Sequence, residues 1–479
     1  MRAHEAGALH ADIGHLRPAW LRPPEDVNGL LEQLWPLTAS RGADGVLTVG
    51  GIDVKTLAEE YGTPAYVFDE ADFRARCRAY QRGFGDTDVY YAGKAFLCKA
   101  VARIVAEEGL GLDVCTGGEL AVALAADFPP ERLGLHGNNK SLAELRAALE
   151  AGVGRIIVDS YDEIARLAAL ASELGVRPRV MVRVTVGVEA HTHEYIATAH
   201  EDQKFGFSLA NGGPDIGPDG GHGAGGAAAE AVRRILAEPS LELIGLHSHI
   251  GSQIFDTSGF EVAARRVLGL QASIRDEHGV ELPELDLGGG FGIAYTTQDD
   301  PLEPADIAAR LLKIVEHECA AYQLEVPKLS VEPGRAISGP STFTLYEVGT
   351  VKDIVLDAGA TRRYVSVDGG MSDNIRTALY DASYSTTLAS RASQAEPALA
   401  RVVGKHCESG DIVVKDEFLP GDVEPGDLLA VPGTGAYCRS MASNYNHVPR
   451  PPVVAVRDGA ARVIVRRESV DDLLALDVG

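Results

Sequence analysis

A lysine follows a short segment of β-branched and aromatic residues early in the chain. The segment is DVYYAGK, and Lys94 comes two residues after Ala92. A lysine at the end of an apolar strand can have a depressed pKa and serve as an amine that forms a Schiff base. Taken alone, an ordinary lysine that extends its charge to solvent is the simpler interpretation. Lys94 is therefore a candidate whose weight depends on its neighbours.

Two further β-rich segments end in polar residues. The first is followed by Asp113 and Glu119 in GLDVCTGGEL, and the second by His136 and Asn138 in HGNNK. Asp and Asn at such positions often serve only as helix caps. These residues gain weight only if the strands that precede them end at one shared face.

Three later segments carry residues suited to binding a charged cofactor. LHSHIGSQ contains His249 and Ser252, and DLGGGFG contains three glycines, Gly288–Gly290, whose N–H groups can approach an anion closely. VEPGR ends a strand with Glu332 and Arg335. Separately these features also fit a structural histidine, a tight turn and a surface ion pair.

The combination is more specific than its parts. A Schiff-base lysine, a histidine that can stack on a ring, a glycine loop for a phosphate and an acid for a ring nitrogen are what a barrel needs to hold pyridoxal phosphate. The sequence therefore predicts pyridoxal 5'-phosphate as the cofactor. No metal is expected, because the six cysteines are scattered and form no CxxC pair.

The elements that must position these residues alternate regularly. Short β-rich segments alternate with longer segments of helical spacing, as in βα units around a parallel sheet. Eight of them match a (β/α)8 TIM-like barrel, whereas an open doubly wound sheet would rarely need eight parallel strands in a row. The fold class is therefore α/β. The eight segments are Asp88 to Ala92, Gly111 to Cys115, Arg132 to His136, Arg155 to Asp159, Arg179 to Thr185, Leu243 to His249, Glu284 to Leu287 and Lys328 to Val331.

After Arg335 the pattern changes to Thr-, Val- and Tyr-rich segments with shorter spacers. This pattern predicts a C-terminal antiparallel β domain over residues 336–479, to which residues 27–63 contribute a short strand before Gly51. The strands expected in residues 336–479 are Phe343 to Val351, Arg363 to Val367, Asp411 to Val414, Leu428 to Val431 and Pro452 to Arg457.

The remaining boundaries follow from these two domains. Residues 64–335 form the predicted barrel, and residues 1–26 form an N-terminal extension without an assigned function. Within the barrel, Asn211 to Gly226 is rich in Gly, Pro and Asp, so it predicts a mobile surface loop.

Composition excludes several classes of function. The chain has 479 residues with a formal net charge of −25, and no cluster of Lys and Arg reverses this charge locally. Nucleic-acid binding is therefore not expected. No segment is apolar enough to span a membrane, and the N-terminus lacks the apolar core of a signal peptide. A cytoplasmic protein is expected.

Seven motifs together resemble a known family. In chain order they are YAGK, HIGSQ, DLGGGFG, EPGR, DGGMSDNIRTALYDA, CESGD and GTGAY. Their order, over about residues 50 to 470, is similar to that of the fold-type III pyridoxal-phosphate decarboxylases and specifically resembles the diaminopimelate decarboxylases. The resemblance implies a decarboxylase that carries pyridoxal phosphate.

The resemblance also implies a role for each barrel residue. Lys94 would form the Schiff base with the cofactor, His249 would stack on the pyridine ring, and Glu332 would bond the pyridine nitrogen and keep it protonated. Ser252, Gly289, Gly290 and Arg335 would hold the phosphate. The complete set expected to bind the cofactor is Lys94, Asp113, His249, Ser252, Gly289, Gly290, Glu332, Arg335 and Tyr437.

Catalysis and substrate binding draw on the β domain as well. The family's proton donor to the substrate Cα is a cysteine that falls on Cys407, so the expected catalytic residues are Lys94, His249 and Cys407. Family members carry the residues that match Cys407 and Glu408 from one subunit into the site of the other, which implies an obligate homodimer. The residues expected to bind the substrate are Arg335, Arg376, Tyr380, Glu408 and Tyr437.

The expected reaction is decarboxylation of meso-2,6-diaminopimelate to L-lysine and carbon dioxide, the last step of lysine biosynthesis. A diaminodicarboxylate presents a distal amine and a distal carboxylate, so its site needs a cation beside an anion. Arg376, Tyr380 and Glu408 can supply these groups. The alternatives are decarboxylation of ornithine, arginine or carboxynorspermidine, a catalytically dead regulator, and an alanine-racemase-like activity, which the acid at Glu332 disfavours.

Overall fold

The computed structural model describes residues 17–187, 203–209, 226–355 and 361–479. The chain forms two compact units. The barrel unit comprises residues 74–292 and 301–336. The β unit comprises the described residues up to 73, residues 293–300 and residues from 337 onward. Each unit is described separately below.

Eight parallel strands form a closed barrel in the barrel unit. Each strand pairs with the next in chain order, and the last pairs with the first. An additional short strand, β10 (Phe207–Ser208), pairs with the end of β9. The predicted α/β fold with a TIM-like barrel is confirmed. The barrel strands are β5 (Asp88–Ala92), β6 (Gly111–Val114), β7 (Leu133–Leu135), β8 (Arg155–Val158), β9 (Arg179–Thr185), β11 (Glu242–Ser248), β12 (Glu284–Asp286) and β13 (Lys328–Val331).

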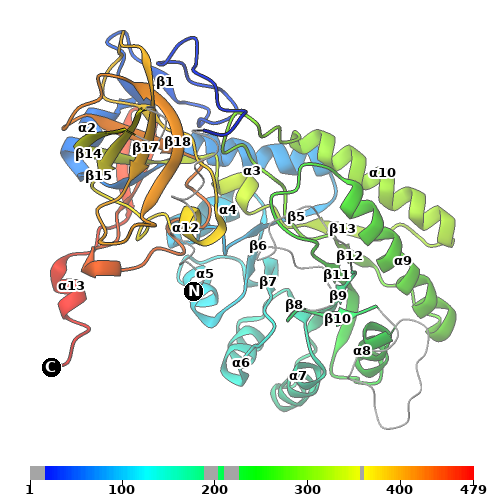
Figure 1. Cartoon of the computed structure of the whole chain (residues 1–479). Helices are drawn as coiled ribbons and strands as arrows, with labels where there is room; N and C mark the ends of the chain where they lie inside the picture. Colours follow the sequence, from blue (N-terminus) through cyan, green and yellow to red (C-terminus); the bar gives the residue numbers. More distant parts are fainter. Residues whose placement is uncertain (1–16, 188–202, 210–225, 356–360) are drawn as a thin grey trace, which may run out of the picture. The chain divides into compact units, whose positions relative to one another are not determined.

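Helices surround these strands, as Figure 1 shows. Their ends follow from local sequence: Ser141 and Glu144 form a capping box at the start of α6, and Ser160 caps α7. Both helices end at a left-handed glycine, Gly152 and Gly175. The helices are α3 (Glu70–Phe84), α4 (Lys99–Glu107), α5 (Gly117–Leu124), α6 (Leu142–Ala151), α7 (Tyr161–Leu174), α8 (Gly226–Leu236), α9 (Ser258–His278), α10 (Pro304–Tyr322) and α11 (Arg335–Ser338).

The main sheet of the β unit is mostly antiparallel, as predicted, with two parallel pairs that the sequence did not predict. β15 pairs in parallel with β17, and β20 pairs in parallel with β4. Long connections, which include α12 (Arg376–Tyr380), make these parallel returns possible. The strands are β4 (Ala65–Asp69), β14 (Thr342–Val355), β15 (Thr361–Val367), β16 (Thr387–Leu388), β17 (Pro397–Val403), β18 (Ile412–Pro420), β19 (Leu428–Pro432), β20 (Val453–Arg457) and β21 (Ala460–Val465).

The start of the barrel differs from the sequence-based boundary at residue 64. β4 lies in the sheet of the β unit, between β14 and β20, and the barrel unit starts at Arg74. All five residues of β4 are buried. A short continuous apolar segment of this kind has no periodicity that assigns it to one sheet rather than another.

The N-terminal segment packs within the β unit. Its strands β1 (Ser40–Arg41), β2 (Leu47–Val49) and β3 (Ile52–Asp53) form a separate antiparallel sheet, which precedes α2 (Val54–Tyr61). The strand expected before Gly51 is β2, and it lies in this small sheet. Leu47 and Trp35 join Phe343 and Leu345 in one buried apolar cluster.

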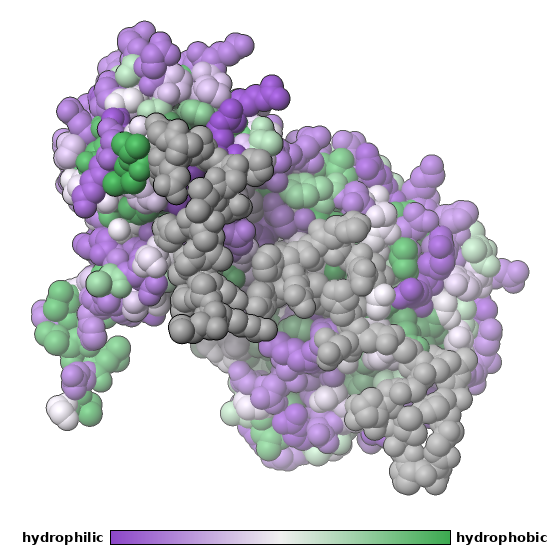
Figure 2. All heavy atoms as spheres, in the orientation of Figure 1, coloured by the Kyte–Doolittle hydropathy of each residue, from purple (hydrophilic) through white to green (hydrophobic). Residues whose placement is uncertain are grey.

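The surface is largely hydrophilic in the view of Figure 2, with scattered hydrophobic residues and a hydrophobic stretch at the C-terminal end. There, α13 (Val470–Leu474) and the residues after it expose Leu474, Leu476 and Val478. None of the described helices is long and apolar enough to cross a membrane. The Gly-rich loop expected at residues 211–226 lies outside the described residues except for Gly226, which begins α8.

A buried ion pair fixes the loop after β7. The Lys140 ammonium donates hydrogen bonds of 2.7 Å to the Glu163 carboxylate and to the carbonyls of Gly137 and Ile157. Both charged side chains are about 1% exposed. The pair joins the loop after β7 to the start of α7.

We expect Lys140→Ala to lower the free energy of unfolding by about 3–5 kcal/mol, because Glu163 would remain as an uncompensated buried charge. The double variant Lys140→Met with Glu163→Gln removes both charges and should lose less stability than the single variant. Urea unfolding of the three proteins measures the difference. Equal stability of Lys140→Ala and the unsubstituted protein would contradict this interpretation.

Candidate active site

Side chains that could perform chemistry gather where the barrel strands end. Lys94 follows β5, Asp113 lies in β6, His136 follows β7, His247 lies in β11 and Glu332 follows β13. Because the strands are parallel and closed into a barrel, their carboxyl ends meet at one face. The buried Asp113, His136, His247 and Glu332 form the centre of this face.

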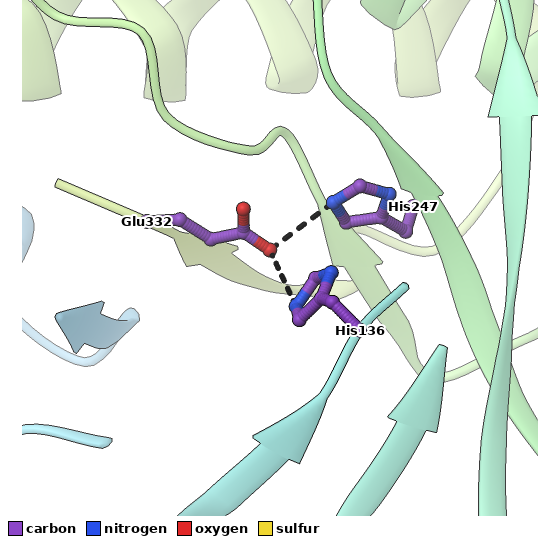
Figure 3. Close-up of side chains that lie close together, drawn as sticks. All are labelled: His136, His247 and Glu332. Atoms are coloured by element: carbon purple, nitrogen blue, oxygen red, sulfur yellow. Dashed lines mark ion pairs between the residues drawn. The ribbon is translucent and has the colours of Figure 1, made fainter. Parts of the chain in front are cut away.

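Two imidazoles converge on one oxygen of Glu332 (Figure 3). His136 Nε2 lies 3.2 Å from Glu332 Oε1, and His247 Nε2 lies 3.1 Å from the same atom. Burial raises the pKa of Glu332, but the charge and hydrogen bonding of His136 and His247 outweigh it and hold that pKa well below the usual value. Glu332 is therefore an ionised carboxylate although it is only 8% exposed.

His136 bridges this carboxylate and a second one. Its Nε2 lies 3.3 Å from Asp113 Oδ1. Burial lowers the pKa of His136, but Glu332 and Asp113 together raise it to about 9. Burial and the charge of Glu332 raise the pKa of Asp113. His136 is therefore protonated at neutral pH and supplies the positive charge between the two acids.

Arg155 in β8 adds a guanidinium to this cluster of charges. Its Nη2 lies 2.6 Å from Asp286 Oδ2, 3.6 Å from Asp113 Oδ1 and 4.0 Å from Glu332 Oε1. Its guanidinium also stacks 3.6 Å from the ring centroid of Tyr90. Arg155 is 1% exposed, so the carboxylates that balance its charge lie inside the barrel.

The cluster of His136, His247 and Glu332 also has the spacing of a metal site, because its potential ligand atoms lie within 4.8 Å of one another. One feature disfavours a divalent cation there: the Arg155 guanidinium, 4.0 Å from Glu332 Oε1, already places a positive charge beside the cluster. The geometry is that of an ion-pair cluster.

His249 is held at the edge of this face by the glycine loop. The N–H of Gly289 donates to His249 Nδ1 over 3.2 Å. Burial and the positive charges of Lys94 and Arg183 lower the pKa of His249 well below its usual value. His249 is therefore a neutral imidazole that accepts at Nδ1 and carries its proton on Nε2.

The glycine loop approaches its neighbours too closely for any side chain. Gly288 and Gly290 have φ angles of +70° and +100°. A Cβ at Gly289 would lie 2.2 Å from the Glu332 carbonyl oxygen, and one at Gly290 would lie 2.4 Å from the Gly251 carbonyl oxygen. The Gly288 N–H donates to Asp286 Oδ1 over 2.7 Å, which anchors the loop to the charge cluster.

The residues expected to hold a phosphate are brought together beside this loop. Arg335 Nη2 donates to Ser252 Oγ over 2.8 Å, and Arg335 is 5% exposed. An ionised acid for a ring nitrogen, a neutral imidazole for a ring face and a glycine loop with an adjacent arginine fit pyridoxal phosphate. Lys94 is exposed on the same face. A neutral His249 matters because a cation would repel a protonated pyridine ring.

In the β unit, Arg376 begins α12 and is buried among aromatic rings. Its guanidinium carbon lies 4.7 Å from the Tyr295 centroid and 5.6 Å from that of Tyr384. It also donates to the Tyr384 hydroxyl, which lies 3.6 Å from Cys438 Sγ. Tyr380, at the other end of α12, is half-buried.

The other predicted residues of the β unit lie in loops. Cys407 is exposed and Glu408 is half-buried, both between β17 and β18. Tyr437 is half-buried, with a left-handed φ of +67°. Sequence reasoning missed His247, Arg155 and Asp286. Arg155 is the one charged residue of β8, and this contrast is its signal, whereas β11 and β12 carry other polar residues beside His247 and Asp286 and give no such signal.

Comparison with known proteins fits this geometry. A family described as "Pyridoxal-dependent decarboxylase, pyridoxal binding domain" matches residues 70–339. The diaminopimelate decarboxylase of Mycobacterium leprae is 57% identical over 485 residues, covering 100% of both chains. That of Mycobacterium tuberculosis strain H37Rv is 59% identical over 94% of this chain and 98% of its own length.

The chain belongs to the diaminopimelate decarboxylase family. Solved structures of the family share its fold. The diaminopimelate decarboxylase of M. jannaschii in complex with L-lysine aligns with a TM-score of 0.83 and 30% identity over 93% of this chain and 99% of that one. The Helicobacter pylori diaminopimelate decarboxylase complexed with L-lysine aligns with a TM-score of 0.77 and 30% identity over 88% and 99% of the two chains. The family predicted from the motifs is confirmed.

We expect His136→Gln to flatten the pH dependence of stability. The pKa of His136 is about 9 in the folded protein and about 6.5 in the unfolded chain. The stabilisation that protonated His136 gives the folded state is therefore complete below pH 6.5 and is lost as the pH rises through 9. The thermal unfolding midpoint of the cofactor-free protein should therefore fall between pH 6.5 and 9.5, and fall less in His136→Gln. His317→Gln, at an exposed position of α10, is the matched control. The same pH slope in all three proteins would contradict a protonated His136.

Proposed function

We propose that this chain is a pyridoxal-phosphate-dependent decarboxylase that converts meso-2,6-diaminopimelate, at its D-configured carbon, into L-lysine and carbon dioxide, the last step of lysine biosynthesis. The observation that carries the proposal is the full-length identity of 57% to a diaminopimelate decarboxylase. The charge cluster of the barrel unit and the buried Arg376 support it independently.

The barrel unit provides the groups that would bind and tune the cofactor. When bound, pyridoxal phosphate supplies a conjugated ring that accepts the electron pair released as the Cα–carboxylate bond breaks. Glu332 is the acid that holds a proton on the ring nitrogen, because its pKa lies well below the usual value and it remains charged. His249 covers a ring face, and Ser252, Arg335 and the glycine N–H groups bind the phosphate.

Lys94 is the amine that would anchor the cofactor. It stands at the end of β5, exposed on the face where Glu332 and His249 lie. Its positive charge lowers the pKa of His249, so the two side chains are close enough to interact. Lys94 and the neutral imidazole therefore belong to one site.

Arg376 is the residue that would select a dicarboxylate. Arg376 is 6% exposed, and within the described residues its Nε has no hydrogen-bond partner. Its described neighbours are the rings of Tyr295 and Tyr384 rather than a carboxylate. A buried guanidinium in such surroundings favours an incoming carboxylate as its partner. Glu408 would hold the distal amine of the same substrate. The Tyr380 hydroxyl would bond one of its oxygens.

Cys407 is the proposed proton donor to the substrate Cα, and Tyr437 a further contact to cofactor and substrate. By the family resemblance, Cys407 and Glu408 of one subunit would complete the site of the other, so the active protein is a homodimer with two shared sites. The acidic chain and the absence of a membrane-spanning helix among the described residues agree with a small-molecule enzyme of the cytoplasm.

The first experiment is an absorbance spectrum followed by product analysis. We expect the protein supplied with pyridoxal phosphate to show a cofactor band that Lys94→Ala abolishes, and to release lysine and carbon dioxide from meso-diaminopimelate in equal amounts. A band without lysine would retain the cofactor but overturn the substrate. No band in the cofactor-supplemented protein would overturn both and favour a regulatory role.

Substitution of Arg376 separates the proposed substrate from a simple diamine precursor such as ornithine. We expect Arg376→Ala to lower kcat/KM for diaminopimelate by about 30- to 1,000-fold, which corresponds to a loss of roughly 2–4 kcal/mol. Arg466→Ala, which removes a largely exposed guanidinium of the same unit, is the matched control and should leave kcat/KM unchanged. An unchanged kcat/KM in Arg376→Ala would refute its role in specificity.

A further inference from the structure

We infer that His406 and Asn446 are positioning residues that hold the loop of Cys407. The inference rests on the proposed function, in which Cys407 donates a proton, and extends it to residues that do not contact substrate or cofactor. The observation behind it is a single amide oxygen: Asn446 Oδ1 accepts from the Cys407 N–H over 3.3 Å and lies 3.1 Å from His406 Nδ1.

The hydrogen-bond chemistry fixes the roles of these atoms. The Cys407 backbone N–H can only donate, so the atom of Asn446 that faces it must be the carbonyl oxygen and not the amide nitrogen. An amide oxygen only accepts, so His406 Nδ1 must carry a proton to bond it. His406 Nε2 lies 2.8 Å from Ser372 Oγ. A serine hydroxyl can donate or accept, so this bond forms whether His406 is neutral or charged.

His406 thereby links three segments that carry the predicted substrate residues. Ser372 precedes Arg376 by four residues, Cys407 and Glu408 follow His406 directly, and Asn446 lies in the segment after Tyr437. The imidazole is buried, at 8% exposure, and packs on the Tyr445 ring with centroids 5.3 Å apart. One buried ring therefore sets the spacing between these loops.

The backbone of the loop is also held by Asp411. Its carboxylate accepts from the N–H of His406 over 2.8 Å and from that of Met371 over 2.6 Å. The Lys405 N–H donates to the Gly369 carbonyl over 3.0 Å. These bonds fix the residues before Cys407, whereas Asn446 holds the Cys407 N–H itself.

Asn446 occupies a backbone conformation that few residues adopt. Its φ and ψ are 51° and 28°, and the following His447 has a φ of +55°. Asparagine tolerates the left-handed region better than most non-glycine residues. The left-handed backbone of Asn446 and His447 turns the Asn446 amide toward the loop of Cys407. The positioning role requires this amide side chain.

The test compares Asn446→Gly with His447→Gly. Glycine adopts a positive φ without strain, so both variants keep the turn, and only Asn446→Gly removes the amide. His447 is exposed and lies outside the proposed catalytic and binding residues. We expect Asn446→Gly to lower kcat by about ten- to 100-fold with KM for diaminopimelate changed less than threefold, since small misplacements of a reacting group have effects of this size. His447→Gly should match the unsubstituted enzyme.

Two conservative variants of His406 identify which contact matters. The amide nitrogen of His406→Asn can occupy the place of Nδ1 and bond Asn446, whereas that of His406→Gln can occupy the place of Nε2 and bond Ser372. We expect kcat to be retained within about threefold in His406→Asn and to fall in His406→Gln as far as in Asn446→Gly. Combining His406→Gln with Asn446→Gly should add little, because Asn446→Gly already removes the contact between Asn446 and His406 that His406→Gln breaks. Full additivity, or a larger loss in His406→Asn, would overturn the inference.

A second readout is independent of lysine formation. The rate of iodoacetamide alkylation of Cys407 in the holoenzyme, followed on its own peptide by mass spectrometry, should change severalfold in Asn446→Gly and His406→Gln but not in His447→Gly. If the unsubstituted protein forms no lysine while alkylation follows this pattern, the proposed function fails and the positioning role stands. Unchanged alkylation and unchanged kcat in Asn446→Gly would overturn the positioning role alone.

Discussion

The ionised carboxylate of Glu332 is the constraint on which the barrel interior depends. A carboxyl group at 8% exposure would take up a proton if it had no partners, because burial disfavours its charged form. Two imidazole nitrogens on one oxygen, with a guanidinium 4.0 Å away, reverse that preference. Six side chains, each in a different barrel strand or directly after it, contribute to this balance, so it requires a closed barrel. The six are Asp113, His136, Arg155, His247, Asp286 and Glu332.

The same charges position the glycine loop. Asp286 bonds Arg155 and Ser330 through one carboxylate oxygen, and the N–H of Gly288 through the other. The next glycine donates to His249 Nδ1, which fixes the tautomer of that ring. A continuous set of contacts thus runs from Arg155 in the barrel interior to the imidazole at its edge. The ionisation of Glu332 and the placement of the glycine loop are therefore set by one network of contacts.

Much of this could be predicted from the sequence, for reasons that are physical. The eight strands were found because parallel strands that are buried on both faces are short apolar segments between amphipathic helices. Lys94, His249, the glycine loop and Glu332 follow these segments directly. His247 was missed although it lies two residues before His249, and residues two apart in a strand share a face. Arg155 and Asp286 were missed because a charged residue in a barrel strand meets its partner only after the barrel closes.

Other features depend on contacts between distant segments, and no local sequence pattern predicts them. β4 belongs to the β unit because it pairs with β14 and β20, more than 270 residues later in the chain. The aromatic surroundings of Arg376 come from Tyr295 and Tyr384, which precede and follow it in separate segments. Each of these assignments is a property of the tertiary structure.

The two units carry their charges in different ways, and this difference bears on how substrate choice can change. In the barrel unit every charge of the cluster compensates another, so replacing one of them leaves a buried charge without its partner. In the β unit Arg376 packs against neutral rings, so its replacement disturbs no partner charge among the described residues. Under the proposed function, the groups assigned to the cofactor must therefore change together, whereas Arg376, the residue proposed to select the substrate, can change singly. A fold organised in this way can keep one reaction while its substrate changes.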